Sequence, residues 1–293
     1  MFKKILIIGC GLIGSSILKS SIKNKISKNI YVNEKSKINK KIIKKIDKKI
    51  KFINNLNKDI EDMDFIIICT PMSEYNFIFS KLNSLVFKKT IITEVGSTKR
   101  NLLKFTKNKD LVLSHPIAGS EVSGPNFGNK ELFNNKLCIL INKGNRSKIK
   151  LVNKFWQKLG SKVILMNVKD HDKIFAITSH LPHLIAYNLI KTAQDFQKLE
   201  KRNLIKYSAG GLRDFSRTAA SNEIMWRDIF FSNKDNMINS INKFIQNLNF
   251  LKRSIKNKKD KELIKILINS KKVRKQIINL KQDVPKPDFG RNI

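Results

Sequence analysis

The stretch TSHLPH holds two of the four histidines in the chain. His180 and His183 flank a proline inside an apolar pattern that predicts a helix over 169–193. An imidazole can accept a proton near neutral pH, bind a metal ion or lie in a core as a satisfied polar group. A metal site would need a further strong ligand. Asp172 lies about three turns from His183 on this helix, so we expect no metal, while a ligand pocket and a structural role stay open.

The predicted helix also carries a polar face. On a regular helix, Asp172, Ser179 and His183 share one side, with Ala176 leaving room between them. Pro182 removes one helical N–H group and should bend the helix at that point. A bend beneath two histidines indicates a surface shaped for a ligand.

A second polar group follows in the segment YSAGGLRDFSRTAASNEIMWRDIF. Guanidinium groups close to apolar residues need anionic partners, and a carboxylate can accept both prongs of one guanidinium. Arg227 stands next to Asp228, which indicates a salt bridge or a helix cap. Either Arg213 or Arg217 would then remain available for the carboxylate of a substrate.

Three strand-like runs end in side chains that could do chemistry. Ligands of parallel sheets bind beyond the carboxyl ends of the strands, so these ends should gather near the reactive end of a cofactor laid across the sheet. A single histidine at a strand end is more often structural than catalytic, but this convergence leaves both roles open for His115. The strand ends supply Thr70 with Pro71, Ser97, and His115 followed by Ser120 and Glu121.

The first segment, KKILIIGCGLIGSSILKSSI, is typical of a strand, a glycine turn and a helix. Its G-x-G-x-x-G spacing suits a dinucleotide, because the glycines allow a tight turn, close approach of the pyrophosphate and close helix packing. The N-terminus of the helix would offer N–H groups to the phosphates. Glu34 ends the next strand and could bond both ribose hydroxyls. It would repel a 2′-phosphate, which favours NAD over NADP although Lys35 and Lys37 lie nearby. The expected cofactor contacts in this region are Gly9, Gly11, Leu12, Ile13, Gly14 and Glu34.

The apolar patterns predict different secondary structure in the two halves of the chain. In the first half, strand-like runs alternate with helix-like segments, which predicts an α/β fold with a mostly parallel sheet covered on both faces. We therefore expect a Rossmann-like dinucleotide-binding domain over 1–167. The part from 168 to 293 reads as an all-helical dimerisation and substrate domain, whose tail QDVPKPDFGRNI should form an extended arm. Strand-like runs lie at 65–71, 90–95, 111–116 and 137–142.

Composition limits the possible partners. The net charge of +36 raises the possibility of nucleic-acid binding, but the lysines are spread evenly along the chain without a basic tail. We expect no nucleic-acid partner and a general preference for anionic ligands. The three cysteines lie in apolar runs, which indicates a reducing compartment. No apolar run is long enough for a membrane span, and the one at the N-terminus is short for a signal peptide. These features predict a cytoplasmic protein.

The chain resembles the prephenate/arogenate (cyclohexadienyl) dehydrogenases of tyrosine biosynthesis over nearly its whole length. The resemblance rests on GCGLIGSS, EVGSTK, HPIAGSEVSGP, HDKIFAITSHLPHLIAYNL, SAGGLRDFSRTAAS, MWRDIF and QDVPKPDFGR. It implies an NAD-dependent oxidative decarboxylation, in which a ring hydroxyl loses its proton, hydride leaves ring C4 for NAD+, and carbon dioxide leaves C1. It also implies a homodimer built by the helical half.

The resemblance implies a role for each candidate residue. His115 would accept the hydroxyl proton, and Ser97 would bridge the substrate hydroxyl and the nicotinamide. Arg217 would clamp the ring carboxylate, and Asp172 would pair with it. His183 would contact the side-chain end of the substrate. The residues that complete the expected pocket are His180, Arg213, Ser120 and Glu121.

Three departures from the family pattern keep the chemistry intact: Ser120 stands where threonine is frequent, Glu94 precedes the GSTK motif where aspartate is common, and Glu34 stands where aspartate often binds the ribose. A non-catalytic dinucleotide sensor is disfavoured because Ser97, His115 and Arg217 are all present. Another β-hydroxyacid dehydrogenase would typically carry a lysine base in the helical half, and no such motif occurs around 171–190. The sequence leaves the choice between prephenate and arogenate open.

Overall fold

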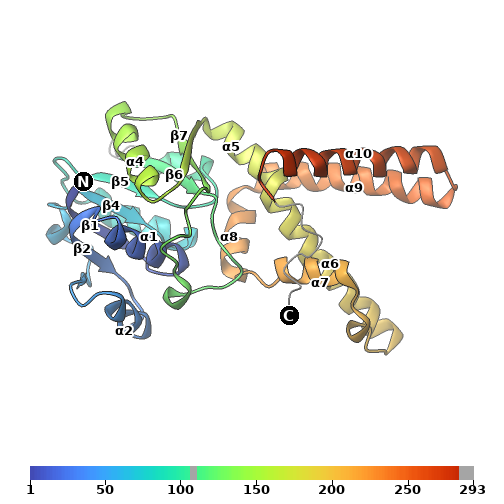
Figure 1. Ribbon diagram of the computed structural model, residues 1–293, viewed down its shortest axis with the longest axis horizontal. Coiled ribbons are helices and arrows are strands. Elements are labelled where there is room, and N and C mark those ends of the chain that lie inside the picture. Colours follow the sequence, from blue (N-terminus) through green and yellow to red (C-terminus); the bar gives the residue numbers. More distant parts are fainter. Residues whose placement is uncertain (106–110, 284–293) are drawn as a thin grey trace.

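The computed structural model describes residues 1–105 and 111–283, and its first half is built on one eight-stranded sheet (Figure 1). The strand order is β3-β2-β1-β4-β5-β6-β7-β8. Every neighbouring pair is parallel except β6 and β7, which are antiparallel. The strands are β1 (Phe2–Ile8), β2 (Ser27–Asn33), β3 (Lys51–Phe52), β4 (Phe65–Ile68), β5 (Ile91–Glu94), β6 (Leu111–Pro116), β7 (Leu137–Ile141) and β8 (Lys162–Met166).

Helices cover both faces of this sheet, as the apolar runs predict. They are α1 (Leu12–Lys23), α2 (Lys37–Ile46), α3 (Tyr75–Asn83) and α4 (Arg146–Lys158). Successive residues of a strand point to opposite faces, so the continuous apolar run of β1 contributes to two cores. Ile5 and Ile7 lie in the cluster that includes side chains of α1 and α4, while Leu6 and Ile8 lie in the cluster that includes side chains of α3. The expected Rossmann-like α/β fold is confirmed.

The order of the strands decides which loops meet. β1, β4, β5 and β6 are consecutive in the sheet and mutually parallel, so their carboxyl ends lie along one edge. The glycine turn after β1, the segment after β4, the Gly96-Ser97 turn after β5 and His115 near the end of β6 therefore share that edge. The strand expected at 137–142 is β7, which follows a long return loop from β6. Its antiparallel direction was not expected from the sequence.

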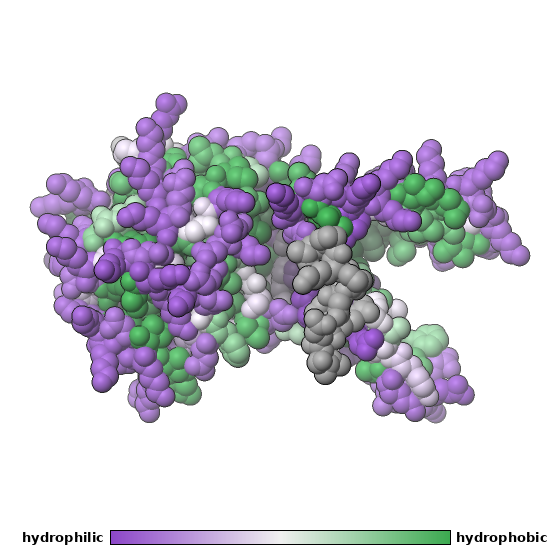
Figure 2. All heavy atoms as spheres, in the orientation of Figure 1, coloured by the Kyte–Doolittle hydropathy of each residue, from purple (hydrophilic) through white to green (hydrophobic). Residues whose placement is uncertain are grey.

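The second half is helical. It comprises α5 (Val168–Phe175), α6 (Leu181–Glu200), α7 (Gly210–Thr218), α8 (Glu223–Ser232), α9 (Lys234–Lys256) and α10 (Asp260–Asn279). α9 and α10 form a hairpin that projects away from the sheet, and α6 projects in a second direction (Figure 1). Apolar side chains are exposed on two arms, which are the α9–α10 hairpin and α6 (Figure 2). Within the described ranges, no helix has both the length and the apolarity that crossing a membrane requires. The expected C-terminal arm lies almost wholly outside the described residues.

The helix expected over 169–193 is interrupted by a π-helical turn. α5 ends at Phe175, the π turn spans Ala176–His180, and α6 begins at Leu181 with Pro182 in its first turn. The Leu181 N–H group donates to the Ala176 carbonyl, five residues back instead of four. This wider turn rotates α6 relative to α5, so the expected shared face of Asp172 and His183 does not form.

Candidate active site

The three glycines of the first turn have three different surroundings. Gly9 has a φ of +80°, and a Cβ there would lie 2.7 Å from the Thr70 side chain. A Cβ on Gly14 would lie 2.2 Å from the Gly9 carbonyl oxygen, so this glycine allows close packing of helix and strand. A Cβ on Gly11 would meet no atom of the described chain within 4 Å. That free space is where a pyrophosphate would approach the backbone.

Other groups beside this turn also suit a dinucleotide. No side chain caps the N-terminus of α1, so its first N–H groups remain available to phosphates. Thr70 Oγ1 is buried without a hydrogen-bond partner among the described residues, which indicates a polar ligand at the end of β4. Glu34 accepts from the N–H groups of Cys10 (3.1 Å) and Ser36 (2.9 Å), which fixes its carboxylate beside the glycine turn.

His115 is the chemically distinctive residue of the sheet edge. Its Nδ1 lies 2.9 Å from Nε2 of His171, and Nδ1 of His171 lies 2.7 Å from Oδ1 of Asp172. Phe175 packs against both imidazole rings at centroid distances of 4.8 and 4.7 Å. Burial lowers the pKa of His115 well below its usual value, and the nearby His171, Lys99 and His180 lower it further. The ring is therefore neutral at pH 7 and able to accept a proton.

A buried ion pair holds the turn that carries Ser97. The Lys99 ammonium donates to the Glu94 carboxylate and to the Ser114 carbonyl, and both charged side chains have no exposed surface. The Glu94 carboxylate also accepts from the N–H group of Gly96 (2.7 Å) and from the Tyr75 hydroxyl (3.2 Å). Because these partners are all donors, the carboxylate is best satisfied in its ionised form. The network anchors the backbone on both sides of Ser97.

The expected pairing of Asp172 with Arg217 is wrong. Asp172 accepts from the backbone N–H groups of Lys99 and Arg100, both at 2.8 Å, at the start of the short helix after β5. Arg217 instead donates to Glu121 at 3.1 Å. The π turn lies between the two groups and rotates α6, on which α7 packs, relative to α5 and Asp172. Asp172 therefore acts on the turn after β5 and on His171.

The two histidines of TSHLPH have different surroundings. His183 stacks on Trp226 with a centroid distance of 3.7 Å, and its Nδ1 lies 2.9 Å from the Ser179 carbonyl oxygen. His180 is fully buried, its Nδ1 lies 3.2 Å from the Asn233 amide, and its Nε2 has no partner among the described residues. Burial lowers the pKa of His180 to about 4 and also lowers that of His183. Both rings are neutral at pH 7.

The remaining predicted residues lie around the edge of the site. Arg213 and Ser120 are exposed, and the Arg217–Glu121 pair joins α7 to the loop after β6. Arg227 pairs with Asp228, as the sequence indicates, and Asp228 also accepts from the Ser73 N–H group at 2.9 Å. His171 was not predicted from the sequence as a residue of the site. Its position next to a carboxylate in the HD pair was the available signal, but nothing local indicated contact with His115.

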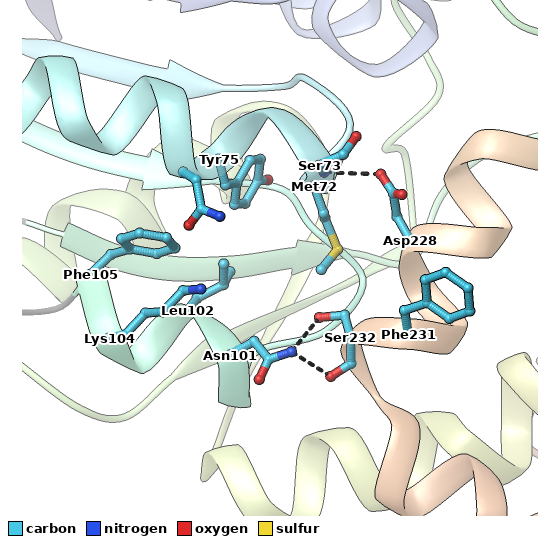
Figure 3. Close-up of a pocket in the computed structure, with 11 residues that line it drawn as sticks. Met72, Ser73, Tyr75, Asn101, Leu102, Lys104, Phe105, Asp228, Phe231 and Ser232 are labelled. Atoms are coloured by element: carbon cyan, nitrogen blue, oxygen red, sulfur yellow. Dashed lines mark hydrogen bonds between the residues drawn. The ribbon is translucent and has the colours of Figure 1, made fainter.

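A separate cavity of about 310 Å³ lies where α8 meets the turns after β4 and β5 (Figure 3). Its walls include Ser73, Asn101 and Ser232. Asn101 donates to the Ser232 carbonyl at 2.8 Å, and the hydroxyl groups of Thr98 and Ser232 lie 2.6 Å apart. These bonds attach the helical half next to the turn that carries Ser97. His115 is not among the residues that line this cavity.

Comparisons with known proteins agree with this arrangement. The family model described as "Prephenate dehydrogenase, nucleotide-binding domain" matches residues 18–165, and "Prephenate dehydrogenase, dimerization domain" matches 167–269. The cyclohexadienyl dehydrogenase of Zymomonas mobilis is 30% identical over 280 residues, covering 94% of this chain and 96% of that protein. The crystal structure of prephenate dehydrogenase from A. aeolicus, in complex with hydroxyphenyl propionate and NAD+, is 32% identical with a TM-score of 0.87. That match covers 94% of this chain and 99% of the other.

Proposed function

The chain belongs to the prephenate dehydrogenase family, and from that membership we propose that it catalyses the NAD-dependent oxidative decarboxylation of prephenate, arogenate or both in tyrosine biosynthesis. The observation that carries this proposal is the buried, neutral imidazole of His115 on the sheet edge that holds the glycine turn. When bound, NAD+ accepts the hydride from ring C4 of the substrate. Loss of carbon dioxide from C1 makes the ring aromatic, which drives the reaction.

The chain's own residues bind the substrate and take its proton. His115 accepts the proton of the ring hydroxyl, because its neutral form is the one favoured at pH 7. Ser97 lies on the anchored turn after β5, where its hydroxyl can bridge the substrate hydroxyl and the nicotinamide. Thr70 and Pro71 complete the nicotinamide end of the cofactor site. Arg217 binds the ring carboxylate, and Glu121 holds its guanidinium.

The far end of the substrate faces the helical half in this proposal. His183, held against Trp226, contacts the side-chain end of the substrate, and the buried His180 supports that wall. Both imidazoles are neutral at pH 7, so they act as hydrogen-bonding groups and not as cations. Ser120 and Arg213 line the entrance. A neutral wall binds a keto or an amino group, which is consistent with either substrate.

Steady-state kinetics with prephenate and with arogenate test the proposal. We expect NADH formation that depends on one of these substrates and is matched by an equal amount of carbon dioxide. The ratio of the two kcat/KM values identifies the preferred substrate. Absence of turnover with both substrates, in a protein that still binds NAD+, would exclude the proposed activity.

We expect NAD+ to be preferred over NADP+. The Glu34 carboxylate is fixed beside the glycine turn, where it would bond the ribose hydroxyls and lie against a 2′-phosphate. The nearby Lys35 is paired with Glu74 at 2.6 Å. Measured kcat/KM values for the two cofactors check this. An equal or higher value with NADP+ would contradict it and would direct attention to Lys35 and Lys37.

Replacing Arg217 with Ala is expected to raise the substrate KM by roughly 10- to 150-fold, because a hydrogen bond to a charged group contributes about 1.5–3 kcal/mol. Lys at this position should recover only part of the loss, since an ammonium does not reproduce the two-pronged geometry. Arg202→Ala removes an exposed arginine after α6 and serves as the matched control. A drop in kcat at unchanged KM in Arg217→Ala would show that Arg217 has a different role.

We infer a homodimer formed mainly by the helical part, which we place from residue 168 onward. Its arms expose many apolar side chains, among them Phe196, Leu248 and Leu267, and exposed apolar patches of this kind mark interaction surfaces. The match to a dimerization domain over 167–269 supports the same assembly. Light scattering should give twice the 33.8 kDa mass of the chain. A monomer mass at micromolar concentration would contradict the dimer.

The cysteines of the chain bear on its cellular location. We infer a reducing, cytoplasmic location, supported by three free cysteines. Burial raises the pKa of Cys10 to about 12, so this thiol stays protonated and unreactive. No nucleic-acid partner is proposed, because the chain's positive charge is distributed over its whole length.

A further inference from the structure

His115, His171 and Asp172 form a continuous chain of hydrogen-bonding groups across the junction of the two halves. His115 belongs to β6, whereas His171 and Asp172 belong to α5. The distances are 2.9 Å between the two rings and 2.7 Å between His171 and the carboxylate. The exposed fractions of the three residues are 8%, 0% and 1%, so water does not compete for these bonds.

The carboxylate end of this chain has a defined protonation state. Asp172 accepts three hydrogen bonds, from His171 and from the N–H groups of Lys99 and Arg100. Burial alone would raise the pKa of Asp172, but these donors outweigh it and hold the pKa below its ordinary value. The carboxylate is therefore ionised at pH 7 and can only accept hydrogen bonds.

The ionised Asp172 carboxylate determines which ring nitrogen carries the proton in His171 and in His115. Because Asp172 can only accept, Nδ1 of His171 must carry a proton. Burial lowers the pKa of His171, so its ring is neutral at pH 7 and its Nε2 is left as an acceptor. Nδ1 of His115 faces that acceptor and must carry a proton in turn. The proton-free nitrogen of His115 is then Nε2, which makes no hydrogen bond within the described part of the chain.

We propose that His171 and Asp172 are positioning residues that hold His115 in the tautomer with its proton on Nδ1, so that Nε2 receives the proton of the substrate hydroxyl. The inference rests on the role proposed above for His115. In the reaction the hydroxyl O–H bond breaks and its proton bonds to Nε2, forming an imidazolium whose Nδ1–H still donates to His171. The proton passes to solvent after product release, which restores the starting state. An ionised carboxylate orients a catalytic imidazole in the same way in serine hydrolases.

The tautomers can be measured without any turnover. Protein labelled with ¹⁵N-histidine contains only four histidines, and NMR correlations of ring nitrogens with ring protons report which nitrogen is protonated. Glutamine substitutions at each histidine assign the signals. We expect both His115 and His171 to carry their protons on Nδ1. A proton on Nε2 of His115 in the wild-type protein would overturn the proposal, whatever the activity of the enzyme.

Substitutions at His171 test the consequence for catalysis. His171→Leu removes the acceptor and should lower kcat by roughly 10- to 100-fold, the range for residues that orient a functional imidazole, with KM values little changed. His171→Gln keeps a carbonyl oxygen that can accept from His115 and should recover part of the loss. In the NMR spectrum, His171→Leu should release the His115 tautomer, while His183→Gln, the matched control, should leave it unchanged.

The outcomes separate this inference from the proposed function. Wild-type protein that turns over neither substrate, yet shows both Nδ1 protons, would exclude the activity and retain the positioning chain. Equal kcat values in wild type, His171→Gln and His171→Leu would reject the positioning role while the activity stands. If His171→Leu does not fold, the wild-type tautomers still decide: protons on Nδ1 of both His115 and His171 support the positioning role, and a proton on Nε2 of His115 rejects it.

Discussion

Replacement of His115 with Asn is expected to lower kcat by roughly 10²–10⁴, the contribution of one general base, with little change in KM for the substrate. Asn preserves much of the size of the side chain and can still donate to His171, but it cannot take the hydroxyl proton. Burial keeps the pKa of His115 well below 6.5. The wild-type kcat/KM should therefore lose nothing to protonation of His115 near neutral pH and should fall only as the solution is acidified toward that lowered pKa.

Steady-state kinetics and NAD+ binding distinguish this role from a structural one. NAD+ affinity should be unchanged in His115→Asn, because the glycine turn and Glu34, which we propose bind the other end of the cofactor, are left intact. If His115→Asn changed only KM, or if Arg217→Ala changed only kcat, the roles assigned to these two side chains would be wrong even though the family membership stands.

Replacement of Lys99 with Met should destabilise the folded protein by about 3–5 kcal/mol, because removing one partner leaves a buried charge without compensation. Lys99 and Glu94 have no exposed surface, and the Glu94 carboxylate depends on Lys99 as its only cationic partner within the described residues. Burial raises the pKa of Glu94, and Lys99 opposes that shift. Without Lys99 the pKa of Glu94 rises further, so the stability lost in Lys99→Met should be partly regained as the pH is lowered.

Denaturant unfolding provides the measurement. Lys89→Met, at an exposed position before β5, is the matched control and should change stability by less than about 0.5 kcal/mol. The double variant Glu94→Gln/Lys99→Met removes the unpaired charge and should be more stable than Lys99→Met alone. Equal stabilities for the wild type and Lys99→Met would show that the ion pair does not hold the turn after β5.

Local signals made the nucleotide-binding half predictable. The spacing of apolar side chains in a strand or a helix can be recognised within a few residues. The glycine spacing at 9–14 is typical of a tight nucleotide-binding turn. The strand predicted at 111–116 matches β6, and the run at 90–95 contains β5. Convergence of the strand ends also followed from the pattern, because alternating strands and helices produce parallel strands whose carboxyl ends share one edge. The run at 137–142 contains β7, but its antiparallel direction was not predicted, since that direction depends on the path of a long loop.

The partners of the charged and titratable side chains were decided only by the tertiary structure. Asp172 and Arg217 were expected to pair, yet Arg217 meets Glu121, which is 96 residues away in sequence. His115 and His171 are 56 residues apart and meet because α5 packs against the end of β6. The π turn between α5 and α6 removes the shared face of Asp172 and His183 that a regular helix would give. The sequence by itself determined the class of fold and the residue types available for catalysis, because those depend on local periodicity. Which imidazole, carboxylate and guanidinium meet was decided by where α5 lies against the end of β6 and where α7 lies near the loop after β6. A partner dozens of residues away leaves no local pattern.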